Sequence, residues 1–332
     1  MKASWTFLAG LGAGFLLMFG LTATAFYLNL GVPGDSSRWA FELNLKKRLL
    51  ANQTASPKLL VVGGSATLFG LSAREIQKQT GWRTINMGTH AALGTAYILH
   101  LAQEAAKPGD TVLLVLEYEL YNYGKVKQTW ADKLLVDYLV SRDPAFFHSL
   151  SPPEQWTVFM LTSFSRLVQG LKDRWRAERP YDDSNFGAYR VRYLNDSGDQ
   201  THHIKAVRPP QRNEVLEWKS ALARGMPEHP EGFSVLTSFC DWARTNQVRI
   251  LATYPNICDQ PGYHEQTARQ VAQTIKDFFS RLNVPVIGDY TDALLPRDQF
   301  FDTNYHPTEE AALARTQRLI PKLNAALTAA HN

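Results

Sequence analysis

Residues 58–65 read Lys-Leu-Leu-Val-Val-Gly-Gly-Ser, an apolar run that ends in two glycines and a serine. A short and wholly apolar run of this kind is typical of a parallel strand that is buried on both faces. The glycines let the backbone turn sharply, which leaves the Ser65 hydroxyl exposed at the carboxyl end of the strand. This stretch therefore predicts the first strand of an α/β domain, with a candidate nucleophile where that strand ends.

Strands and helices continue to alternate along the chain, on both sides of an irregular region. Four further strands are predicted at 83–87, 111–116, 249–253 and 284–287. Helices are predicted at 39–50, 94–107, 233–246, 264–282 and 309–326. Five strands with helices between them predict a doubly wound parallel sheet. In such a sheet the functional site lies beyond the carboxyl ends of the strands.

Several helix ends carry recognisable capping residues. Ser72 and Glu75 have the spacing of a capping box, in which each side chain accepts a backbone N–H of the other residue. Gly81 is expected to end that helix. Thr308 is the expected N-cap of the last helix, with Glu309 in the first turn, where the helix dipole favours acids.

Residues 118–232 interrupt the alternation and are rich in aromatic residues, arginine and proline. Helices are predicted within them at 130–140, 155–178 and 211–223, and the whole region is interpreted as an insertion that covers the site or contacts a partner. Trp156, Phe159, Met160 and Phe164 recur at helical spacing. Such a stripe usually packs inward, so a core position is favoured over a membrane or partner contact.

Residues 3–34 contain no charged side chain, and the apolar part, 5–30, is long enough to cross a bilayer. A retained anchor is favoured over two alternatives. One is a cleaved signal peptide, since Ala23-Thr24-Ala25 resembles a small-residue cleavage site, and the other is a buried core helix. The predicted organisation is an anchor or uncleaved signal at 1–34, a connector at 35–57 and one domain at 58–332. Its core comprises 58–117 and 233–332, and its insertion comprises 118–232.

Basic residues follow the apolar segment at Arg38, Lys46, Lys47 and Arg48 and would draw that side toward the cytoplasm. Large domains after a single N-terminal span are nevertheless commonly exported. A single-pass membrane protein with a periplasmic or extracellular domain is therefore expected.

The composition limits the classes of function. Hydrophobic residues make up 45% and charged residues 20% of the chain, as in ordinary globular proteins. The net charge of +4 is dispersed, which argues against a nucleic-acid partner. Cys240 and Cys258 do not have metal-ligand spacing, so they are either a disulfide or two buried thiols. Neither a metal nor a cofactor is expected.

The candidate base for Ser65 lies near the far end of the chain, in residues 301–307, directly before the last helix. A serine hydroxyl is a poor nucleophile until a base takes its proton. His306 is the expected base, and Asp302 would fix the imidazole tautomer and stabilise the imidazolium. His90 would lie near the same site, either as a substrate contact or, as favoured here, as a histidine that caps a helix entry.

These blocks resemble the SGNH (GDSL-like) hydrolase superfamily, and more closely its membrane-associated branch. That branch includes the alginate O-acetylation proteins and the teichoic acid D-alanyl transfer protein. The matching blocks are Gly63-Gly64-Ser65, Asn86-Met87-Gly88, and Asp302 to His306 with Pro307. The resemblance covers 58–116 and 248–325 and excludes the insertion.

The resemblance implies a flavodoxin-like, three-layer fold in which Ser65 attacks an acyl carbonyl and His306 acts as the base. The backbone N–H groups of Ser65 and Gly88 would bind the oxyanion, with Gly64 in the same block. Two departures stand out. Asp302 precedes His306 by four residues, where the family usually has three. The family's third block supplies an oxyanion-binding Asn, for which Asn122 is the candidate substitute here.

Two functions follow as hypotheses. The first is a membrane-anchored serine esterase or O-acyltransferase that acts on an envelope or exported polysaccharide. It would use an acyl donor, a polysaccharide acceptor and a membrane-embedded acyltransferase as partner. The alternative is a catalytically impaired SGNH-fold module that serves as a binding or assembly partner of such an acyltransferase or of a polysaccharide secretion complex.

Overall fold

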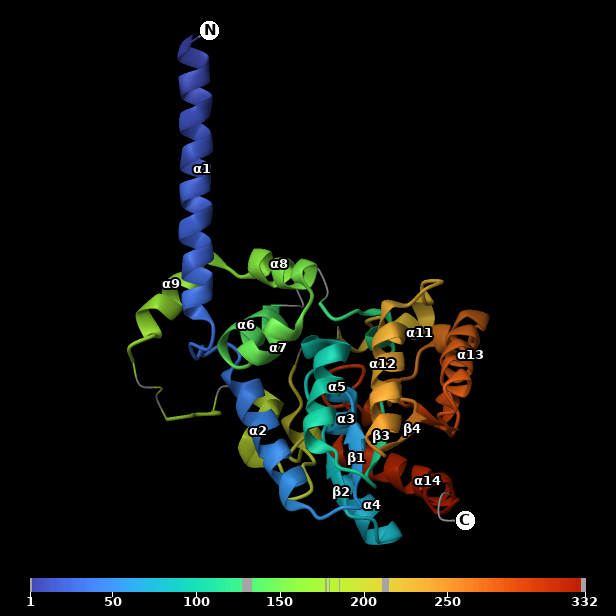
Figure 1. The fold of residues 1–332 in the computed structure, drawn as a ribbon. Helices are drawn as coiled ribbons and strands as arrows, with labels where there is room; N and C mark the ends of the chain where they lie inside the picture. The colour runs from blue at the N-terminus through green and yellow to red at the C-terminus, as the bar shows by residue number, and fades with distance from the viewer. Residues whose placement is uncertain are drawn as a thin grey trace. The chain divides into compact units, whose positions relative to one another are not determined.

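Two compact units make up the chain in the computed structural model, which describes residues 2–126, 133–176, 178, 180–184, 186–210 and 215–329 (Figure 1). Unit 1 consists of Met1–Phe41 and Gln128–Tyr181, and unit 2 consists of Glu42–Lys127 and Asp182–Asn332. Helix α2 (Arg38–Gln53) crosses the division. The predicted insertion, 118–232, is divided between the two units, so it does not form a compact body of its own.

Unit 2 contains a five-stranded sheet with the order β2-β1-β3-β4-β6, in which every neighbouring pair is parallel. Its strands are β1 (Leu59–Val62), β2 (Thr84–Asn86), β3 (Thr111–Leu114), β4 (Arg249–Thr253) and β6 (Val286–Ile287). The predictions of an α/β class and of a five-stranded parallel sheet are confirmed. The predicted strands at 83–87, 111–116 and 284–287 were each too long, because strand pairing is confined to 84–86, 111–114 and 286–287.

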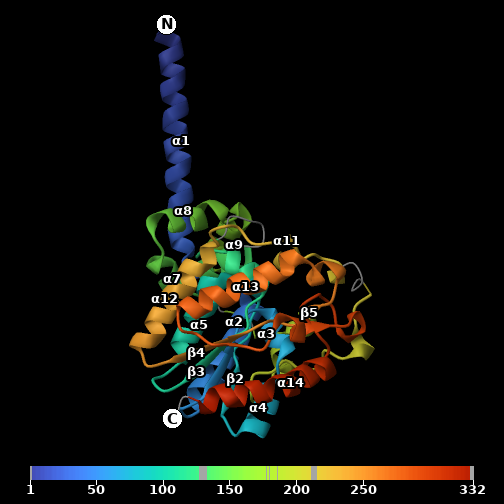
Figure 2. The same ribbon diagram turned by 90° about the vertical axis from the view of Figure 1, so that its right-hand side faces the viewer.

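Helices pack against this sheet in two groups. In the described part of unit 2, the helices that follow α2 include α3 (Ser65–Gly70), α4 (Ala73–Thr80), α5 (Gly94–Ala105), α11 (Ala221–Arg224), α12 (Glu231–Thr245), α13 (Gln266–Arg281) and α14 (Glu309–Thr328). Helix α12 contacts α5 and β4, whereas α14 contacts α3, α4 and β6 (Figures 1 and 2). Leu59, Val61, Leu113 and Leu319 form a buried core between the sheet and α14.

The capping predictions are confirmed except for half of the capping box. The Ser72 hydroxyl accepts the Glu75 N–H at 3.2 Å, and Gly81 ends α4 with a φ of +77°. Thr308 caps α14. The Ser72 N–H, however, donates to the Thr316 hydroxyl at 3.0 Å instead of to Glu75. The predicted return bond was wrong because α14 packs close enough to α4 to supply an acceptor.

In its described residues, unit 1 consists of helices joined by short loops. Besides the start of α2, its helices are α1 (Lys2–Asn29), α6 (Lys133–Ser141), α7 (Pro144–Ser149), α8 (Pro152–Leu161) and α9 (Phe164–Asp173). The single helix predicted at 155–178 was wrong. It is broken between α8 and α9, where the Ser163 hydroxyl accepts the Arg166 N–H and starts a new helix.

Two other predictions in the irregular region fall partly on residues outside the described ones. The helix predicted at 130–140 corresponds to α6, and residues 130–132 lie outside the described part. The helix predicted at 211–223 begins outside it, at 211–214, and was wrong at its end. There α11 starts only at Ala221, after the N-cap Ser220.

The expectation that the aromatic stripe of α8 and α9 packs inward was wrong for three of its four residues, whereas Phe159 is half-buried and packs against Phe26. Trp156, Met160 and Phe164 are 51%, 61% and 75% exposed. Two short strands were not predicted, β5 (Ile257–Cys258) and β7 (Leu294–Leu295), which pair in parallel.

Cys240 and Cys258 are buried free thiols, so the disulfide alternative was wrong.

Helix α1 contains a 25-residue stretch, Trp5–Asn29, that is long and apolar enough to cross a membrane. The most apolar part of this stretch is not buried within the structure, so the alternative of a buried core helix was wrong. A signal sequence shares the same length and composition.

Candidate active site

The predicted nucleophile lies where β1 ends and α3 begins. Ser65 is the first residue of α3 and is buried, at 8% exposed, so the expectation of an exposed hydroxyl was wrong. A side chain at Gly63 would collide with the carbonyl oxygen of Val115, and one at Gly64 would collide with the carboxylate of Glu117. Both glycines are therefore required by the close approach of β3 and the chain that follows it.

Glu117, to which the sequence analysis assigned no role, lies directly against this turn. Its carboxylate accepts the Ala66 N–H at 2.7 Å and the Gly64 N–H at 3.1 Å, and it lies 3.5 Å from the Ser65 hydroxyl oxygen. Burial raises the pKa of Glu117, against the opposing effect of these backbone N–H groups. The amides that begin α3 are thus occupied by a carboxylate of the chain itself.

His306 and Asp302 form the predicted pair. The His306 Nδ1 lies 2.7 Å from the Asp302 Oδ1. The four-residue spacing is bridged because the loop folds back on itself, with the Phe301 N–H donating to the His306 carbonyl at 2.7 Å. Burial acts to raise the pKa of Asp302, but His306 and the hydrogen bond to it outweigh burial, and the pKa is lowered. Asp302 therefore stays ionised and orients the imidazole.

The ring of His306 is held by aromatic contacts. Phe69 of α3 stacks against it with a centroid distance of 4.3 Å. With its Nδ1 proton directed at Asp302, the imidazole presents Nε2 as a hydrogen-bond acceptor. That is the tautomer that a general base requires.

Tyr189 connects Ser65 with His306. It ends the 3₁₀ helix η4 (Gly187–Tyr189), within the region predicted to be an insertion. Its hydroxyl lies 3.5 Å from the His306 Nε2 and hydrogen-bonds the Ser65 side chain. In the described part of the chain, no hydrogen bond joins Ser65 and His306 directly. Burial, followed by the charge of Asp302, raises the pKa of Tyr189, so the hydroxyl remains protonated.

His90 also lies at this site, beside Tyr189. The rings of His90 and Tyr189 are 5.2 Å apart, and the His90 Nδ1 accepts the Ala92 N–H at 3.1 Å. Burial, together with repulsion from His306, lowers the pKa of His90 to about 4. His90 is therefore neutral and acts as the cap of the 3₁₀ helix η1 (Ala91–Leu93), which is the favoured prediction.

The second sequence block, Asn86-Met87-Gly88, stabilises the turn and α3 through the Asn86 side chain. Asn86 donates to the carbonyl oxygens of Thr67 at 3.1 Å and Leu71 at 3.0 Å. The Gly88 N–H donates to the Asn86 Oδ1 at 2.9 Å. The N–H that the resemblance assigns to an oxyanion is therefore engaged by Asn86 in this structure.

Asn122 shows no connection to Ser65 among the described residues. It ends the 3₁₀ helix η2 (Tyr118–Asn122), and its side-chain oxygen is buried without a hydrogen-bond partner. The side chain that follows β3 and reaches the serine is Glu117, an acid in place of the expected amide.

His203 is a further buried histidine behind His306. Its Nδ1 lies 2.8 Å from the Pro307 carbonyl oxygen and its Nε2 lies 2.9 Å from the Gln200 carbonyl oxygen. Its ring also contacts Phe69 at 5.3 Å. It therefore supports the backbone that positions His306. Within the described ranges, no three His, Cys, Asp or Glu side chains are grouped so that they could hold a metal ion.

Comparison of this sequence with models of known protein families and with curated protein sequences finds no match. The site must therefore be interpreted from its own chemistry. A serine at a helix start, a histidine oriented by an aspartate and a tyrosine hydroxyl between them can activate a hydroxyl toward an electrophile. The buried carboxylate of Glu117 works against the negative charge that such a reaction develops.

Proposed function

We propose that this protein is a membrane-anchored serine esterase or O-acyltransferase of the SGNH type, acting on an envelope or exported polysaccharide. The observation that carries the proposal is the chain of groups from Ser65 through Tyr189 to His306 and Asp302. In support, the strand order β2-β1-β3-β4-β6 places the turn after β1 and Glu117 after β3 on neighbouring strands, where the chain order of the strands reverses. Ligands bind at that point in such folds.

The proposed reaction uses His306 as base and then as acid. The acyl ester first takes the place that the Tyr189 hydroxyl occupies between Ser65 and His306. His306 Nε2 then takes the Ser65 proton as the serine oxygen bonds to the carbonyl carbon of the ester. The tetrahedral intermediate then expels the alcohol, which leaves with the proton held by His306. Water, or a sugar hydroxyl of the acceptor, reverses these steps and releases the acyl group as an acid or as a new ester.

A second candidate function is favoured by one specific observation. Glu117 accepts the Gly64 and Ala66 N–H groups on either side of Ser65, and Asn86 accepts the Gly88 N–H that the resemblance assigns to an oxyanion. Loss of a single oxyanion-hole donor costs about a hundredfold or more in rate. An SGNH-like module whose site is inert, and which binds a polysaccharide or a membrane acyltransferase, would tolerate this arrangement.

Fluorophosphonate labelling separates the two candidates. The full-length chain in detergent micelles is treated with the probe at pH 5–9, and its intact mass is measured. The enzyme proposal expects one adduct on the wild type, none on Ser65→Ala, and labelling slowed roughly 100-fold or more in His306→Gln, because general base catalysis is lost.

Ser238→Ala, a matched change on the exposed face of α12, is expected to label like the wild type. Absence of the adduct from both the wild type and Glu117→Gln at every pH would overturn the enzyme proposal and favour the inert module.

A further inference from the structure

Helices α8 and α9 of unit 1 expose large apolar side chains that a water-facing surface would not retain. Trp156, Met160 and Leu161 of α8 and Phe164, Leu171 and Trp175 in and after α9 are all exposed, and Trp175 is 86% exposed. We refer to these six residues as the α8–α9 apolar surface. Exposed apolar side chains gathered on two consecutive helices indicate a site of contact with a partner or a membrane.

This surface is continuous with the last third of α1. The ring of Phe19 lies 6.0 Å from Trp156 and 5.9 Å from Phe159. The Asn29 side chain donates to the Leu167 carbonyl of α9 at 3.0 Å. Helix α1 is therefore joined to α8 by aromatic contacts and to α9 by hydrogen bonds within the same unit.

The length of α1 places this junction at the edge of a bilayer. A span of about 20 residues at about 1.5 Å per residue crosses the hydrocarbon core. Counted from Lys2, the first charged residue, such a span ends close to Leu21. Phe19, and with it Trp156, would then lie where the hydrocarbon meets the headgroups, the level at which tryptophan is enriched.

Charges at the end of α9 suit the same position. Lys172, Arg174 and Arg176 are exposed there, with Asp173 as the acidic residue among them. The Arg174 guanidinium also donates to the Leu28 carbonyl at the end of α1. Exposed cations beside an apolar surface are attracted to anionic lipid headgroups.

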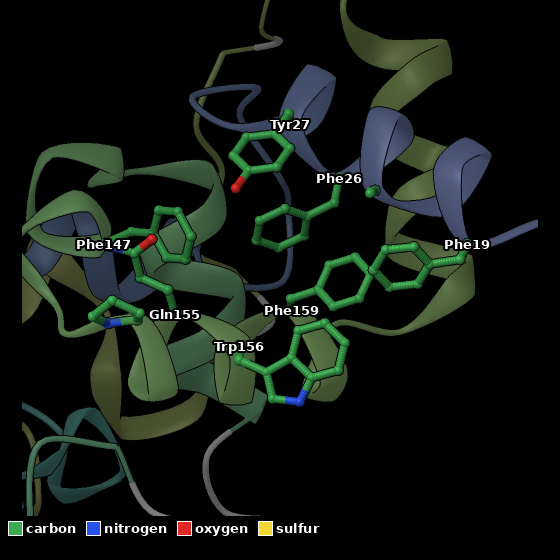
Figure 3. A pocket seen from close by; sticks show the side chains of 9 residues that line it. Phe19, Phe26, Tyr27, Phe147, Gln155, Trp156 and Phe159 are labelled. Atoms are coloured by element: carbon green, nitrogen blue, oxygen red, sulfur yellow. The ribbon is translucent and has the colours of Figure 1, made fainter. Parts of the chain in front are cut away.

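A cavity of about 270 Å³ lies between α1, α7 and α8 (Figure 3). Its apolar wall includes Phe19, Ala23, Phe26, Phe147, Trp156 and Phe159. Figure 3 shows the rings of Phe26, Phe159 and Trp156 gathered around it, and the Phe26 and Phe159 centroids are 5.3 Å apart. The lining also includes Tyr27 and Gln155, and the Gln155 amide nitrogen is engaged by the Leu150 carbonyl at 2.8 Å. Aromatic walls of this kind favour an apolar ligand.

We propose that this cavity binds an acyl chain of a membrane lipid, with the α8–α9 apolar surface seated in the lipid interface. The ligand class follows from the aromatic wall and from the bilayer that would surround α1 at this level. The inference does not depend on chemistry at Ser65. Its occupant is a lipid tail, and the headgroup would meet the cations after α9.

Acyl-chain photocrosslinking tests the proposal. The full-length chain is reconstituted into vesicles of phosphatidylcholine and phosphatidylglycerol that contain a phosphatidylcholine with a diazirine in its acyl chain. After irradiation, adducts are mapped by mass spectrometry. Adducts are expected on residues 147–159 as well as on the first half of α1, which serves as an internal control for insertion.

Ala23→Phe, which fills the cavity, should reduce the adducts on 147–159 at least fivefold and leave those on the first half of α1 unchanged. Ala13→Phe adds the same bulk to α1 away from the cavity and should change neither. Adducts confined to α1 in the wild type would overturn the proposal.

A second measurement covers the case in which Ala23→Phe fails to fold. Vesicles with brominated acyl chains should quench part of the tryptophan fluorescence, and Trp156→Phe should remove a resolvable share of that quenching. Equal quenching in the wild type and Trp156→Phe would contradict the placement of α8 in the interface.

Discussion

Two helices of unit 2 begin against a carboxylate from another part of the chain. At the start of α4, Asp199 accepts the Ala73 N–H at 2.7 Å and the Arg74 N–H at 3.0 Å. At the start of α3, Glu117 takes up two backbone N–H groups in the same way. Both arrangements use the attraction between an anion and the free amides of a helix N-terminus.

The surroundings of the two carboxylates differ. The charge of Lys47 acts on Asp199, and the side chain of Ser72 caps α4 and also donates to Asp199 at 3.1 Å. Glu117 is buried with Glu119 as the charged neighbour, and α3 has no side-chain cap. The start of α4 is built to be stable, whereas the start of α3 retains an unfavourable buried acid beside Ser65. Local conflicts of that kind are expected at functional sites.

The largest effect should come from removing Asp199. Asp199→Ala leaves the first amides of α4 unsatisfied and Lys47 without its nearby charge, so we expect a loss of about 3–5 kcal/mol in the free energy of unfolding. Urea unfolding of the full chain in detergent micelles, followed by circular dichroism, measures it. Asp196→Ala, an exposed acid in the same loop, is the control. Equal stability of the two variants would contradict the assigned role of Asp199.

Lys47 should make stability depend on pH. Burial lowers its pKa from 10.5 to about 7, and Asp199 only partly offsets this. The folded state therefore binds fewer protons than the unfolded state between these values, and stability should rise as the pH increases from about 7 toward 10.5. The slope is at most about 1.4 kcal/mol per pH unit.

Lys47→Met should abolish that slope, and the neighbouring Lys46→Met should preserve it. The measurement is the urea midpoint at several pH values. A slope that survives in Lys47→Met would show that another group is responsible.

The sequence predicted those parts of the site that depend on local patterns. Ser65 follows an apolar run, and the loop with Asp302 and His306 precedes a capped helix, so both were found. Glu117 could have been noticed as an acid that directly follows a buried strand. Tyr189 and Asp199 left no signal, because their partners come from segments far away in the chain and depend on tertiary packing.

The side-chain cap of α4 should contribute a smaller amount. Ser72→Ala removes the acceptor of the Glu75 N–H and one donor to Asp199, and we expect a loss of about 1 kcal/mol. Differential scanning fluorimetry and urea unfolding both measure it. Ser238→Ala on α12, away from any cap, should stay within about 0.5 kcal/mol of the wild type. If Ser72→Ala and Ser238→Ala lose the same amount of stability, the side-chain cap contributes nothing measurable. The starts of α3 and α4 would then no longer differ in this respect.

Glu117→Gln should have the smallest effect on stability, and its sign depends on pH. Burial raises the pKa of Glu117 in the folded state, so the folded protein binds this proton more tightly than the unfolded chain. The stability that this tighter proton binding provides is fully present below the unfolded-state pKa of about 4.5. It is lost as the pH rises through the raised pKa of the folded state. The wild type should therefore lose stability with rising pH above about 4.5, and Glu117→Gln should lack that contribution.

At pH 5 the variant should be within about 1 kcal/mol of the wild type, because one neutral hydrogen bond is exchanged. At pH 8 it should be relatively more stable, while Glu228→Gln, an exposed control, should follow the wild type throughout. Ser65 should also react faster with a fluorophosphonate in Glu117→Gln, because no anion then opposes the charge that develops on the phosphonyl oxygen. If neither the pH slope nor the labelling rate changes, Glu117 is equivalent to Asp199, and the start of α3 is a structural cap like that of α4.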